Sequence, residues 1–111
     1  EFPTEINAGN ALSALNGIMG NASKTMKSVK DVDSAKAALP EIDKMTSQVK
    51  TIGSSLGSLP EPVKAKLLKA VQDFAPGFMK LVNKAYKIEG VEAILEPKIG
   101  PLLKAMEDAV S

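Results

Sequence analysis

Apolar residues recur at spacings of three and four along almost the whole chain, and this periodicity is the strongest constraint on its fold. Such spacing places apolar side chains on one face of an α-helix. No stretch shows the sustained alternation of apolar and polar residues that is typical of a half-buried strand. The sequence therefore predicts an all-α fold. The four apolar runs are Leu12, Leu15, Met19, Ala22, Met26 and Val29; Ile42, Met45, Val49, Ile52, Leu56 and Leu59; Leu67, Val71, Phe74, Phe78, Leu81, Ala85 and Ile88; and Val91, Ile94, Ile99, Leu102, Met106 and Ala109.

Capping and helix-breaking residues divide the chain into four segments. Residues 31–34 are typical of a helix stop followed by an N-cap, residues 57–62 contain two prolines, and Glu89-Gly90 separates the last two segments. We expect one domain over residues 1–111, with helices at approximately 4–30, 34–57, 61–88 and 91–110. Because the connections are short, neighbouring helices should run antiparallel. The expected architecture is a four-helix up-down bundle.

Prolines lie inside three of the expected helices, at Pro40, Pro76 and Pro97. Each falls at the outermost position of its heptad, where a missing backbone hydrogen bond bends the helix around the core. The sequence predicts proline-kinked helices, and the alternative is two short helices that meet at each proline. Kinked helices can leave an apolar pocket between them. The candidate lining of such a pocket is Phe74, Phe78, Leu81, Ile99, Leu102 and Met106.

The residue types that the chain lacks exclude several kinds of chemistry. Its 111 residues include no Cys, His, Trp or Arg, and all fourteen basic residues are Lys. Without Cys and His there is no thiolate nucleophile, no zinc–sulfur site and no imidazole base. We therefore predict that the protein is not an enzyme, with no catalytic residues, no cofactor and no metal site.

The charges are nearly balanced, with a formal net charge of +1. Lysines cluster near two helix ends, at residues 24–30 and 80–87, and the acidic starts of the next helices follow at 31–33 and 89–92. We expect these groups to mix at one end of the bundle, so that no basic patch forms and no nucleic acid is bound. No apolar run approaches the ~20 residues that a membrane-spanning helix needs, which predicts no transmembrane segment.

The segment Asp33-Ser34-Ala35-Lys36-Ala37-Ala38-Leu39-Pro40-Glu41-Ile42, together with the later Leu59-Pro60 step, resembles a family of small exported helical proteins of planctomycete-type bacteria. The resemblance covers one helix and one loop. It implies a helical bundle in the periplasm or outside the cell, and it carries no known activity. The chain starts at Glu1-Phe2 without Met, which fits either a removed leader or a cloning remnant.

A non-catalytic interaction or structural module is the role that we expect. Such a module would present a helical face to an unknown protein partner or to a second copy of the chain. The candidate face comprises Met79, Tyr86 and Leu103, which fall off the main apolar seams. The alternative is a carrier or sensor of a small apolar ligand held between kinked helices. An enclosed cavity near Phe78 and Met106 would favour the carrier, and a tight core with an exposed apolar patch would favour the interaction module.

Overall fold

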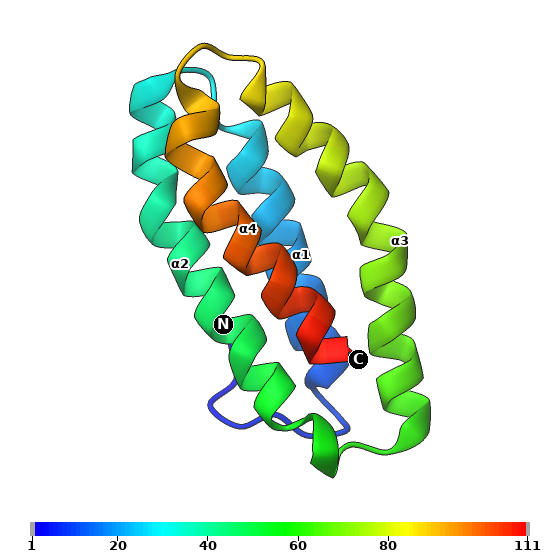
Figure 1. Cartoon of the computed structure of the whole chain (residues 1–111). Coiled ribbons are helices and arrows are strands. Elements are labelled where there is room, and N and C mark those ends of the chain that lie inside the picture. Colours follow the sequence, from blue (N-terminus) through cyan, green and yellow to red (C-terminus); the bar gives the residue numbers. More distant parts are fainter. Residues whose placement is uncertain (1, 111) are drawn as a thin grey trace.

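The computed structural model describes residues 2–110 and confirms the expected all-α four-helix architecture. The helices are α1 (Ala11–Lys27), α2 (Val32–Ser54), α3 (Glu61–Tyr86) and α4 (Val91–Val110), and a short 3-10 helix η1 (Leu56–Ser58) lies between α2 and α3. Consecutive long helices run in opposite directions (Figure 1). No strand is present in the described part of the chain.

The first helix differs from the expectation, because it begins at Ala11 and not at residue 4. The side-chain oxygen of Asn7 accepts hydrogen bonds from the backbone N–H groups of Gly9 (2.9 Å) and Asn10 (3.1 Å). The side-chain oxygen of Asn10 accepts a third one from the backbone N–H of Asn7 (2.8 Å). Asparagine side chains that bond nearby backbone groups stabilise a turn at the expense of a helix. Residues 7–10 therefore form a turn that leads into α1.

The expected caps and breakers account for the other boundaries. The Asp31 carboxylate accepts a hydrogen bond from the backbone N–H of Ser34 (2.8 Å), and the Ser34 hydroxyl accepts one from the backbone N–H of Asp31 (3.1 Å). This reciprocal capping box starts α2. Pro62 lies in the first turn of α3, where the missing N–H costs no helical hydrogen bond. Gly90, with φ at 84°, makes the reversal into α4.

The helices continue through their prolines. Pro40 lies inside α2, Pro76 inside α3, and both Pro97 and Pro101 inside α4. All four are exposed, as the heptad positions of the first three predict. On this face, water can hydrogen-bond the carbonyl group that each proline leaves without a helical partner. The alternative of two short helices at each proline is wrong, and α3 instead follows a bowed path (Figure 1).

The helices that lie closest in space are not the ones expected. If helices consecutive in the chain were also the closest in space, every pair of spatial neighbours would be antiparallel. The most extensive helix–helix contact joins α2 to α4, and the next joins α1 to α3. Both of these pairs are parallel (Figure 1). The segment of residues 55–60 therefore crosses the end of the bundle diagonally from α2 to α3, and the side chain of its Leu59 is buried. Gly53 lies at this α2–α4 contact, where a Cβ atom placed on it would be 3.4 Å from both the Cα and the Cβ of Ala109, an ordinary van der Waals distance.

Burial is uneven among the helices. The 26-residue α3 buries only four side chains, those of Leu67, Phe78, Val82 and Ala85. The 20-residue α4 buries seven. Much of the apolar arc of α3 is half-buried or exposed. Helix α3 therefore leaves more of its apolar surface partly exposed than α4 does.

Candidate functional site

The six residues expected around an apolar pocket occupy three different settings in the structure. Phe78, Ile99, Leu102 and Met106 are all at most 2% exposed and belong to the core. Phe74 is half-buried and stacks on Phe78, with ring centroids 5.0 Å apart and ring planes at 23°. The sixth residue, Leu81, faces a groove between α1 and α3.

This α1–α3 groove has a volume of about 640 Å³ and lies where both helices end. Its floor is apolar and consists of Met26, Val29, Leu81, Ala85 and Ile88. Met26, Val29 and Ala85 are buried, and Leu81 and Ile88 are half-buried. The volume falls in the range of roughly 300–1,000 Å³ that is typical of small-molecule sites.

Lysines line the rest of the α1–α3 groove. Lys27 comes from the last turn of α1, Lys30 from the connection after it, and Lys84 from the last turn of α3. No acidic side chain lines the groove. This end of the bundle is charge-mixed as expected, since the charge of Lys30 contributes to lowering the pKa of Asp31. The expectation did not include the groove itself, where the parallel contact of α1 with α3 brings lysines of both clusters together.

A second surface lies on the opposite flank of α3, beside α4. Leu68 and Met79 are the exposed large hydrophobic residues, at 40% and 36% exposure. Their separation of eleven residues is three helical turns, so both lie on the same face of α3, and Tyr86 follows Met79 two turns later. Leu103 is half-buried on α4. We call Leu68, Met79, Tyr86 and Leu103 the α3–α4 face.

Tyr86 marks where this face adjoins α4. Partial burial raises the pKa of its phenol, and the nearby carboxylates of Glu96 and Glu92 raise that pKa further. The C-terminal end of α3, at Tyr86, therefore lies close to the first turns of α4. Met79, Tyr86 and Leu103 could be predicted from the sequence. Leu68 could not, because Leu67 beside it satisfies the core spacing.

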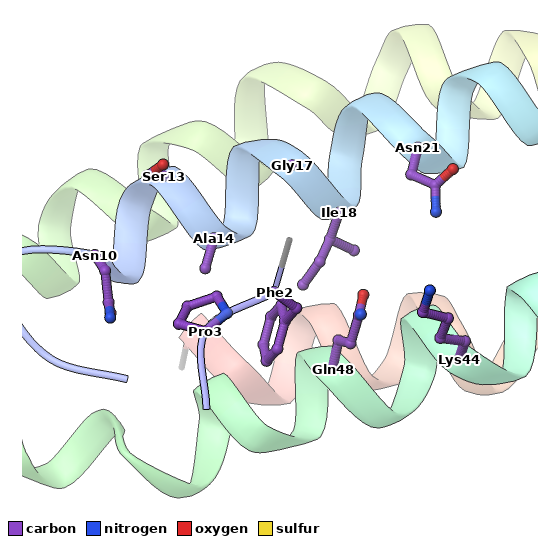
Figure 2. A pocket seen from close by; sticks show the side chains of 10 residues that line it. All are labelled: Phe2, Pro3, Asn10, Ser13, Ala14, Gly17, Ile18, Asn21, Lys44 and Gln48. Carbon is purple, nitrogen blue, oxygen red and sulfur yellow. The ribbon is translucent and has the colours of Figure 1, made fainter. Parts of the chain in front are cut away.

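A third hollow, of about 600 Å³, lies between α1 and α2 and is partly filled by the N-terminal segment. Figure 2 shows the ring of Phe2 between the two helices, close to Ile18 and Gln48. At the far end of the hollow, the amide of Asn21 donates a hydrogen bond of 2.5 Å to the carboxylate of Glu41. This hollow is a site of packing by the chain itself.

No group of three or more His, Cys, Asp or Glu side chains among the described residues could hold a metal ion. No helix of the described part is both long enough and apolar enough to cross a bilayer. Comparison with protein families, with curated proteins and with solved structures finds no match to this chain.

Proposed function

We propose that this protein is a non-catalytic interaction module that binds an amphipathic helix of a partner protein along the α3–α4 face. One observation carries the proposal: the exposed large hydrophobic residues Leu68 and Met79 fall on one stripe of one helix. Single exposed hydrophobic residues need no explanation, but an aligned pair on the same helix face as half-buried Tyr86 is typical of a surface that another helix covers.

The carboxylates of Glu92 and Glu96 lie near Tyr86, at one end of the face, and along α3 itself charge favours an acidic partner over a second copy of the chain. Helix α3 carries five lysines and two acidic residues, Glu61 and Asp73. Two copies of α3 packed against each other would bring lysines of both copies together, and like charges at an interface oppose association. A partner helix with acidic residues beside its apolar stripe would avoid this repulsion.

Export to the periplasm or outside the cell is the location that we propose, on the resemblance of residues 33–42 and of the Leu59-Pro60 step to exported helical proteins. Fractionation of the host cell, with immunodetection of the chain, tests this. Recovery with cytoplasmic markers would contradict it.

The test of partner binding compares the wild-type chain with a Leu68→Gln/Met79→Gln variant in affinity capture from the host, followed by cross-linking mass spectrometry. Both side chains are exposed, so the variant should fold. We expect one protein, cross-linked to α3 through an acidic helical segment, to be captured by the wild type and lost from the variant. A Lys44→Gln/Lys50→Gln variant, which changes two exposed side chains of α2, should still capture it.

Two outcomes would contradict the proposal. Identical capture by wild type and by Leu68→Gln/Met79→Gln would mean that the α3–α4 face is not the binding surface. A dimer of the purified chain that the same double substitution dissociates would identify the occupant as a second copy.

A further inference from the structure

The α1–α3 groove combines two properties that a single ligand chemistry can satisfy. Its floor is apolar, and three lysines, Lys27, Lys30 and Lys84, line the remainder. None of the three makes an ion pair within 4 Å of another described residue, and Lys30 interacts electrostatically with Asp31 at longer range. We propose that this groove binds a single-chain amphiphile with an anionic headgroup, represented chemically by a long-chain fatty acid. Its acyl chain would lie on the floor and its carboxylate would lie among the lysines.

The lysines have an ordinary explanation that does not account for the groove between them. Cations are favoured in the last turn of a helix because they interact with its dipole, and Lys27 and Lys84 occupy such positions. The helix dipole explains why each lysine occurs near the end of its helix. It does not explain why a groove of about 640 Å³ with an apolar floor lies between the two helix ends. That space exists because the parallel helices α1 and α3 end at the same level (Figure 1).

Other ligand chemistries satisfy only one of the two properties. A neutral apolar molecule would cover Leu81 and Ile88, but it would bring three ammonium groups next to a ligand that offers them no acceptor. A polyanion would meet the lysines without using the apolar floor, and a cationic amphiphile would be repelled. An anionic headgroup on an acyl chain uses both the floor and the lysines.

This inference is independent of the proposed partner surface. Leu81 and Met79 are two positions apart in α3, which places them about 200° apart around the helix axis. Met26 lies in the groove and Met79 on the α3–α4 face. The methionine methyl groups therefore distinguish the two surfaces in one experiment.

The experiment is titration of the full chain, labelled with ¹³C at its methionine methyl groups, with hexadecanoate below its micelle concentration. We expect the Met26 resonance to shift in a saturable manner while Met79 stays unchanged. Octanoate should bind at least tenfold more weakly, because it covers less of the floor. Hexadecyltrimethylammonium, with the same chain and the opposite charge, should bind more weakly than hexadecanoate.

The matched variants are Lys27→Gln/Lys84→Gln and Lys50→Gln/Lys66→Gln. Both lower the net charge equally, and Lys50 and Lys66 belong to the opposite end of the bundle, where α2 ends and α3 begins. The first variant should bind hexadecanoate roughly three- to tenfold more weakly, and the second should bind it like the wild type. The inference is overturned by an unmoved Met26 resonance, by equal losses in both variants, or by equal binding of the cationic amphiphile. A shift confined to Met79 would also overturn it and would place the amphiphile on the α3–α4 face.

Discussion

A disulfide between α2 and α4 tests the least expected feature of the fold, the parallel contact of these two helices. The perturbation is the double substitution Gly53→Cys/Ala109→Cys, in a chain that has no other cysteine. A Cβ atom at position 53 would lie 3.4 Å from the Cβ of Ala109. This distance is just below the range of roughly 3.5–4.5 Å in native disulfides, so a small adjustment should allow the bond.

The magnitude follows from the length of chain that the bond would close, from residue 53 to residue 109. Loop-closure entropy in the unfolded chain gives a stabilisation of about 4 kcal/mol, and strain in engineered disulfides commonly reduces such values. We expect a net gain of about 2–4 kcal/mol, which raises Tm by on the order of 10 °C for a domain of this size.

The assay is thermal unfolding of the oxidised variant with and without reductant, after free-thiol titration and mass spectrometry have established intramolecular bond formation. The reduced variant is the control for the two substitutions themselves. If the thiols stay free under mild oxidation, or if the cysteines pair only between chains, the α2–α4 contact is not as described. In the expected arrangement, α2 and α4 would lie on a diagonal of the bundle, too far apart for a disulfide.

Three further predictions concern local features. Phe78→Ala should lower the free energy of unfolding by about 3–5 kcal/mol in denaturant titration, because Phe78 is 1% exposed, whereas Met79→Ala beside it should cost less than about 1 kcal/mol; equal losses would contradict the orientation of α3. The backbone N–H and hydroxyl of Ser34 lower the pKa of Asp31 from 3.8. The stabilisation from the ionised Asp31 should therefore persist above this value and disappear as the pH falls through the lowered pKa. The Tm of the wild type should thus fall toward that of Asp31→Asn between pH 6 and pH 2.5, and a pH-independent difference would refute this reasoning. Gly20→Ala should stabilise the fold by about 0.5–1 kcal/mol, since a Cβ there meets nothing within 4 Å. Gly90→Ala should destabilise it, because φ is 84° and the added Cβ would lie 2.9 Å from Val32; chemical denaturation of both variants checks the two signs.

Apolar spacing was sufficient to predict the helices and most of their buried faces. Phe78 and Leu67 are buried as their spacing requires. The prediction of buried residues was less accurate where two apolar residues are adjacent in the sequence, because either of them fits the helical spacing of three or four. In α4 the sequence analysis selected Ile94, but Leu95 is fully buried and Ile94 only half-buried. Periodicity gives the orientation of a helix to within about one residue, or 100°, and tertiary contacts decide the rest.

The first helix shows a second limit. Pro3 and Thr4 are acceptable as a helix start, but Asn7 and Asn10 bond nearby backbone groups and hold a turn as far as residue 10. Both asparagines are visible in the sequence. Whether their side chains cap a helix or stabilise a turn depends on which backbone groups they reach, and local propensity does not determine this.

The spatial order of the helices explains why the groove could not be found from the sequence. The helix dipole favours lysines in the last turns of α1 and α3 whatever the arrangement of the bundle. If every neighbour were antiparallel, each of those ends would lie between acidic helix starts and the charges would mix. In the observed order the two ends are adjacent, so lysines of both helices line one hollow. The same linear pattern of charge is thus compatible with a neutral end or a basic groove, and the diagonal crossing of residues 55–60 decides between them. The structure shows Leu59 buried in the core and Gly53 close to Ala109, and the linear pattern of charge contains neither of these tertiary contacts.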